Sequence, residues 1–149
     1  MTPQPYLTVA SLLSGFGITV FMFRIDRELQ VRRENPEWPN WLSWADYLVI
    51  ANIVISLVLV VIPLVAVPEP GPVQYSIAGG GCAAAAILQL GYPFAILDHY
   101  RIEIGTWRTR RGEPPSERHK GEPIEKAIVI GAGILAVAVF VGIVFARNF

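Results

Sequence analysis

The stretch YLVIANIVISLVLVVIPLVAVP, residues Tyr47–Pro68, contains 22 residues and no Asp, Glu, Lys or Arg. A helix rises about 1.5 Å per residue, so about 20 residues of this kind cross the roughly 30 Å of hydrocarbon in a bilayer. Three more stretches lack charge: Met1–Phe23 with 23 residues, Gly71–Leu97 with 27 and Ala127–Ala146 with 20. We therefore predict an all-α membrane protein with four transmembrane helices in a bundle.

Composition supports this class over a soluble helical bundle. Hydrophobic residues make up 53% of the chain and charged residues 16%, whereas soluble domains carry about 25% charge. A soluble bundle would place charge every few positions along the outer face of each helix, and the four stretches have none. We predict a single domain over residues 1–149, with spans at about 6–23, 45–67, 74–97 and 124–146. The polar loops are then 24–44 and 98–123.

The basic residues predict how the chain is oriented. Segment 24–46 carries four of them and segment 98–126 carries seven, so eleven of the 12 Lys and Arg residues fall in alternate connections. Short loops rich in Lys and Arg remain on the cytoplasmic side of a membrane. We expect both polar loops to be cytoplasmic and the N- and C-termini to be outside. The expected location is the plasma membrane.

Local signals predict where the second and first helices begin and end. Arg24–Asn35 contains no helix breaker, and Pro36 disfavours helix at the residue before it, so the first helix should extend into the cytosol and end near Asn35. Ser43 and Asp46 form the S-x-x-D pattern of a helix start. Pro63 is expected to kink or end the second helix near the outer face.

Aromatic residues gather near the predicted cytoplasmic surface. Trp38, Trp41, Trp44 and Tyr47 recur every three residues, and Trp107 follows the third span, whose helix we expect to continue into the second loop. Amphipathic rings prefer the headgroup level of a bilayer. We interpret the five as membrane-interface residues, the alternative being an aromatic platform for a ligand.

Small residues on spans 1, 3 and 4 predict close contact between helices. Their lack of side-chain bulk lets two backbones approach within a membrane. The predicted helix-packing residues are Ser11, Gly15, Gly79, Gly80, Gly81, Gly131 and Gly133. The glycine triplet also weakens helix, so an alternative interpretation is a broken third helix that lines a substrate cavity.

Four polar residues lie within the apolar stretches: Ser14, Thr19, Asn52 and Gln89. Such side chains either bond to a neighbouring helix or line a cavity. We name them as candidate cavity-lining residues, because a shared cavity would indicate a pore. Contacts made separately to neighbouring helices would instead indicate packing.

No residue pattern predicts catalysis, a cofactor or a metal site. A metal site needs several converging His, Cys or carboxylate ligands, and the chain has two His and one Cys. The net charge of zero gives no sign of a nucleic-acid partner. An enzyme acting at the membrane surface would have to use Asp98, His99 and His119.

The leading hypothesis is a non-enzymatic membrane protein that acts through helix–helix contacts. It would be a homo-oligomer or a small subunit of a membrane complex, with the lipid bilayer and itself or another membrane subunit as partners. The alternative is an oligomeric channel or carrier for an ion or small solute. The apolar stretches contain no ionisable Asp, Glu, Lys or Arg, which transporters of ions and protons usually keep at depth.

Overall fold

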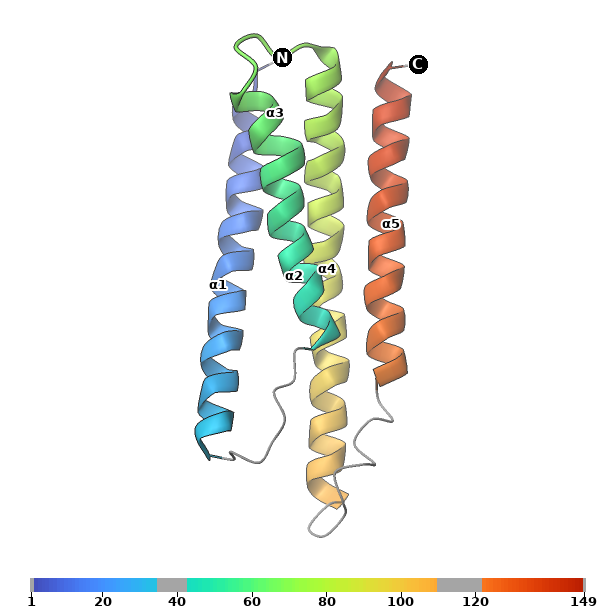
Figure 1. Cartoon of the computed structure of the whole chain (residues 1–149). Coiled ribbons are helices and arrows are strands. Elements are labelled where there is room, and N and C mark those ends of the chain that lie inside the picture. Colours follow the sequence, from blue (N-terminus) through green and yellow to red (C-terminus); the bar gives the residue numbers. More distant parts are fainter. Residues whose placement is uncertain (1, 35–42, 110–121, 149) are drawn as a thin grey trace.

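The computed structural model describes residues 2–34, 43–109 and 122–148, and within them all regular structure is helical. Helices α1 (Gln4–Glu34), α2 (Trp44–Ile55), α4 (Pro72–Thr109) and α5 (Glu122–Asn148) make up most of the chain. The π-helical segment η1 (Ser56–Val61) and the short α3 (Ile62–Val65) continue α2. The helices lie side by side as long rods (Figure 1).

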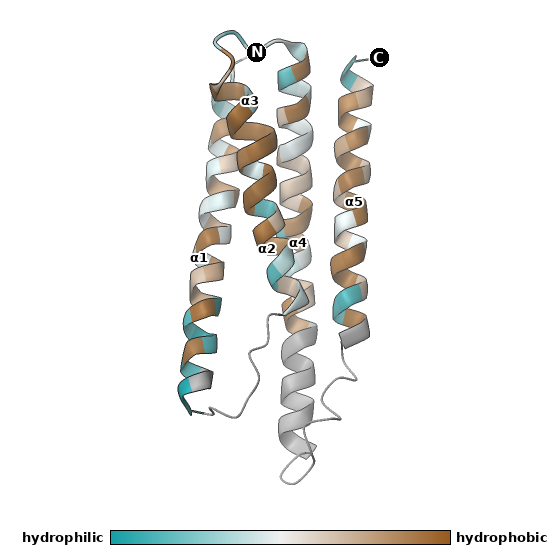
Figure 2. Cartoon of the chain, in the orientation of Figure 1, coloured by the Kyte–Doolittle hydropathy of each residue, from teal (hydrophilic) through white to brown (hydrophobic). Residues whose placement is uncertain are grey.

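Four helical stretches are long and apolar enough to cross a membrane: Gln4–Gln30, Trp44–Val65, Pro72–Leu97 and Ile124–Asn148. This confirms the predicted all-helical class and indicates a membrane-embedded protein. Hydrophobic residues line these helices, while hydrophilic ones gather in the lower part of α1 (Figure 2). Many large apolar side chains face outward, such as Leu12, Ile134 and Phe145, as expected for surfaces in contact with lipid.

The two ends of the bundle differ. The first turn of α1 and the last turn of α5 lie at one end, which we call the terminal end (Figure 1). At the opposite loop end, α1 and α4 extend past the first turns of α2 and α5 (Figure 1). Helix α1 continues to Glu34 and α4 to Thr109, which confirms the predicted continuation of both helices beyond their apolar stretches. The stop predicted from Pro36 lies outside the described residues.

Helix α4 lies at the centre of the packing and contacts α1, α2 and α5. The buried core is rich in alanine, which allows short distances between helix axes. One cluster near the middle and loop end contains Ala45, Leu48, Val49, Ala84, Leu88, Tyr92, Ala95 and Ala136. A second cluster at the terminal end contains Ala10, Val60, Leu64, Tyr75 and Ala78.

Glycines of α4 lie at the closest contacts. A Cβ atom on Gly80 would lie 2.9 Å from the Phe140 ring, and one on Gly81 would lie 2.9 Å from Val60 Cγ2. The helix runs unbroken through this triplet, so the broken-helix interpretation is wrong. Close packing on both sides outweighs the roughly 1 kcal/mol by which each glycine disfavours helix. A break would also leave backbone groups without hydrogen-bond partners in hydrocarbon.

The second rod changes its winding before Pro63. Proline has no N–H, so the carbonyl of Leu59 lacks the donor that an α-helix would give it. The chain widens into the π-helical segment η1, in which the Ile62 N–H donates to the Leu57 carbonyl five residues earlier. Pro63 then lies in the first turn of α3. The predicted disturbance at Pro63 therefore takes the form of a wider helical turn.

Candidate functional site

Charged side chains from three helices are buried together at the loop end. Arg24 of α1, Asp46 of α2 and Glu125 of α5 are respectively 6%, 2% and 2% exposed. Arg24 Nε lies 3.4 Å from Asp46 Oδ1, and Arg24 Nη1 lies 2.8 Å from Glu28 Oε1. Tyr92 of α4 is also buried and within electrostatic reach of Asp46 and Arg24. We call Arg24, Asp46, Tyr92 and Glu125 the polar junction.

The polar junction caps the first turn of α2. The N–H groups that begin a helix have no partner within it. Here the Ser43 N–H donates to Asp46 Oδ2 at 3.1 Å, and the Ala45 N–H donates to Glu125 Oε1 at 3.0 Å. The first bond confirms the helix start predicted from Ser43 and Asp46. The second comes from another helix, and both carboxylates lie where the helix dipole favours negative charge.

The polar junction buries charged side chains close to one another and to the start of α2. Arg24 faces Asp46 of α2 and is also paired with Glu28 of its own helix, while the α2 dipole favours the two buried carboxylates. Removing one partner of a buried ion pair costs more than making the pair gains. The arrangement can hold α1, α2 and α5 in register.

Prediction from sequence missed the polar junction. Arg24 was assigned to a polar loop, and Asp46 and Glu125 fell at the beginning of predicted spans, where no contact was predicted for their side chains. A usable signal was the Ser43–Asp46 cap, because it places Asp46 inside the first helical turn. The contact between Ala45 and Glu125 joins residues 80 positions apart, and no local pattern encodes it.

The interface aromatics are described in part. Trp44 begins α2, and its ring centroid lies 5.6 Å from that of Tyr47 and 4.9 Å from Lys126 Nζ. Tyr47 is 50% exposed. Trp38 and Trp41 lie outside the described residues, as does the side chain of Trp107. Their place in a membrane interface stays a prediction.

A second polar group lies deeper, between α1, α2 and α4. Asn52 has no exposed surface, and its Nδ2 donates to Gln89 Oε1 at 2.6 Å and to the Leu13 carbonyl at 3.1 Å. Gly17 leaves room for this amide, since a Cβ there would lie 3.1 Å from Asn52 Nδ2. We call Asn52 and Gln89 the amide bridge.

The structure brings two of the four candidate cavity-lining residues together, in the amide bridge. Ser14 is buried and donates to the Ala10 carbonyl at 2.6 Å, four residues earlier in its own helix. Thr19 is exposed and donates to the Gly15 carbonyl at 2.9 Å. The contacts of these four side chains are therefore bonds between or within helices.

The predicted helix-packing residues fall into two groups. Gly79, Gly80 and Gly81 each have side chains of other helices within contact distance. Gly15, Gly131 and Gly133 have nothing within 4 Å of an added Cβ, and Ser11 is exposed. The first group packs within the chain, and the second faces outward.

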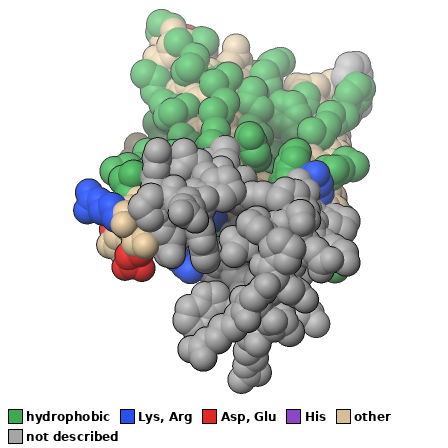
Figure 3. Space-filling view, turned by 60° about the horizontal axis from the view of Figure 1, so that its bottom comes forward, with side chains coloured by type: hydrophobic (Ala, Val, Ile, Leu, Met, Phe, Trp, Pro, Cys, Tyr) green, Lys and Arg blue, Asp and Glu red, His purple; other side chains and the backbone are tan. Residues whose placement is uncertain are grey.

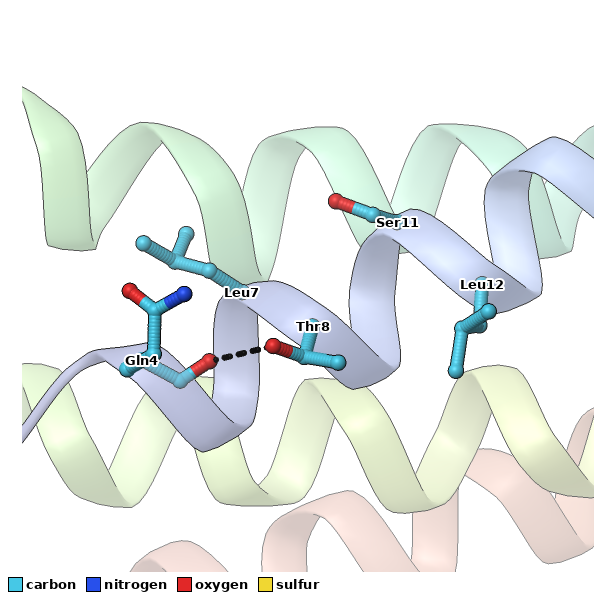
Figure 4. A pocket seen from close by; sticks show the side chains of 5 residues that line it. All are labelled: Gln4, Leu7, Thr8, Ser11 and Leu12. Carbon is cyan, nitrogen blue, oxygen red and sulfur yellow. Dashed lines mark hydrogen bonds between the residues drawn. The ribbon is translucent and has the colours of Figure 1, made fainter.

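A shallow hollow lies on the surface of α1 near the terminal end (Figure 4). Gln4, Leu7, Thr8, Ser11 and Leu12 line it, and the Thr8 hydroxyl donates to the Gln4 carbonyl at 3.0 Å. All five belong to one helix, and none of these lining residues is charged. The hollow is a shallow depression of the α1 surface.

Among the residues whose side chains the structure describes, no three His, Cys, Asp or Glu residues form a group that could hold a metal ion. The side chains of Asp98 and His99, and the whole of His119, lie outside the described residues. Comparison of the chain with protein-family models, curated proteins and solved structures found no match in any of the three.

Proposed function

We propose that this chain is a plasma-membrane protein that acts through contacts between helices, as a homo-oligomer or as a subunit of a larger membrane complex. One observation carries the proposal. Glycines on α1 and α5, namely Gly15, Gly131 and Gly133, face open space. A glycine facing lipid loses both side-chain contacts and helix propensity, whereas one facing a second helix permits close approach.

The outward small residues of α5 form a stripe. Ala127, Gly131, Ala138 and Gly142 are all exposed and follow one another at intervals of four, seven and four residues. These intervals place them on one helical face. The face lies beside the one that packs on α4 through Ala132 and Ala136. A second helix could therefore reach the stripe without displacing α4.

The orientation that we propose has the polar loops in the cytoplasm and both termini outside. Its support is the concentration of Lys and Arg in the two loops. Figure 3 brings the loop end forward and shows charged side chains gathered there, with hydrophobic side chains beyond them. Lipid headgroups and the cytoplasmic parts of a partner would meet the chain at this end.

Disulfide crosslinking between copies tests the proposal. In a Cys82→Ala background, Ala138→Cys, which lies on the stripe and leaves Gly131 unchanged, is expected to form a crosslinked dimer in native membranes. The matched control is Val137→Cys, which is also exposed, at 63%, but lies on a different face of α5. Equal crosslinking of both variants, or of neither, together with a monomeric mass by native mass spectrometry in nanodiscs, would contradict a homo-oligomer.

A second candidate function, an oligomeric channel or carrier for an ion or small solute, is favoured by the polar junction. Ionisable residues buried among membrane helices often mark proton or ion pathways. Proton flux into liposomes that contain the purified protein tests this candidate. Flux above that of protein-free liposomes, abolished by Asp46→Asn, supports it, and flux that Asp46→Asn leaves unchanged opposes it.

A further inference from the structure

Two buried polar atoms near η1 have no protein partner. Asn52 Oδ1 and Ser56 Oγ each lack a hydrogen bond, and both side chains are 0% exposed. The residues are four apart on the second rod and so share one face of it. Buried oxygens of this kind nearly always have a partner in native proteins, often an ordered water.

The orientation of the Asn52 amide is fixed by a backbone group. Nδ2 uses both of its hydrogens, one on the Leu13 carbonyl and one on Gln89 Oε1. Turning the amide over would place Oδ1 against the Leu13 carbonyl, and two acceptors cannot bond to each other. Rotation of Gln89 does not relieve that clash. Asn52 Oδ1 therefore stays an acceptor that needs a donor.

General helix geometry allows one water molecule to join the two oxygens. Residues four apart on a helix have Cβ atoms about 5–6 Å apart, and a water that bonds to two oxygens at about 2.8 Å each spans such a gap. A water can donate to Asn52 Oδ1 and either donate to or accept from Ser56 Oγ. An aliphatic group at this place would leave both oxygens without a partner.

We propose that Asn52 and Ser56 bind a single internal water molecule at the junction of α2 and η1. Ser56 is the first residue of the π-helical segment. The water extends the amide bridge by one turn and links the widened segment to α1 and α4. The site is independent of the oligomer proposed above.

The test uses the whole protein in lipid nanodiscs. Nuclear magnetic resonance is expected to show magnetisation transfer from water to the Asn52 side-chain amide protons, reduced severalfold in Ser56→Ala. The same variant is expected to unfold about 2–4 °C lower, because it removes one of the ligands of the water. Ser76→Ala on α4, at an equally buried serine with 1% exposure, is the control and should leave the transfer unchanged.

Two results would contradict the proposed water site. A serine hydroxyl without any partner destabilises the fold, so Ser56→Ala would then unfold at a higher temperature than the wild type. That rise, or the absence of transfer to the Asn52 amide in the wild-type protein, would overturn the water site. The spectrum of the wild-type protein decides the question even where the variant is poorly expressed.

Discussion

The glycines of α4 and those of α5 have the same chemistry and opposite surroundings. Gly80, Gly81 and Gly91 of α4 would each place a Cβ 2.9 Å from an atom of another helix. Gly131 and Gly133 of α5 would place it in open space. In α4 the glycines therefore allow other helices of the same chain to pack closely. In α5 the two glycines face a surface that no other described helix of the chain covers.

The difference follows from position in the bundle. Helix α4 contacts all the other rods, while α5 lies at the edge, with α4 and α2 as its neighbours. In the most apolar part of α5, 6% of the residues are buried, whereas 33% are buried in the corresponding part of α4. Small residues are necessary for α4 to sit at the centre. In α5 they are in excess of what its contact with α4 requires.

The largest expected effect comes from filling the contact at Gly81. Gly81→Val adds side-chain atoms where even a Cβ would lie 2.9 Å from Val60 Cγ2 and 3.0 Å from Leu59 Cβ. Overpacking of this kind costs about 1–3 kcal/mol. Unfolding in a mixed micelle titrated with denaturing detergent measures it. The matched variant Gly131→Val should change stability by less than about 0.5 kcal/mol, and equal losses at both sites would abolish the distinction between the two helices.

A smaller effect is expected where α5 is held by a polar contact. Glu125→Ala removes the acceptor of the Ala45 N–H and leaves that group buried, at a cost of about 1–2 kcal/mol. Glu125→Gln keeps an acceptor and should restore most of the loss. Hydrogen exchange at Ala45 is the direct measurement, and it should quicken in the alanine variant. Unchanged exchange would mean that α5 is held by its apolar packing on α4 alone.

Much of this fold could be predicted from sequence because its signals are local. Stretches without charge gave four helices, and the Ser43–Asp46 spacing gave the start of α2. Which faces of the helices meet depends on contacts between distant residues, and composition does not encode them. For this reason the Gly81 and Gly131 positions looked alike, and no sequence pattern indicated that Glu125 lies beside the start of α2.

The amide bridge allows the contact between α4 and α2 to be tested separately from the contact between α4 and α5. Asn52→Leu removes the bonds to Gln89 and to the Leu13 carbonyl, and hydrogen bonds between membrane helices contribute about 0.6–2 kcal/mol. A double-mutant cycle with Gln89→Leu should give a coupling energy near 1 kcal/mol. Additive losses in the two variants would show that the bridge adds nothing beyond the separate environments of the two amides.

The smallest effect on stability, and the sharpest on association, is expected at Gly131. Gly131→Ala adds a methyl group with nothing within 4 Å, and alanine favours helix over glycine by up to about 1 kcal/mol. The isolated chain should therefore keep or slightly raise its stability. A neighbouring helix on the stripe Ala127, Gly131, Ala138 and Gly142 would meet that methyl group, so the fraction of dimer crosslinked through Ala138→Cys should fall. Misfolding would lower both the stability and the dimer fraction. A lower dimer fraction at unchanged or higher stability therefore reports on the contact itself. An unchanged dimer fraction would place the contact elsewhere, with Ser11 and Gly15 on α1 as the next face to substitute.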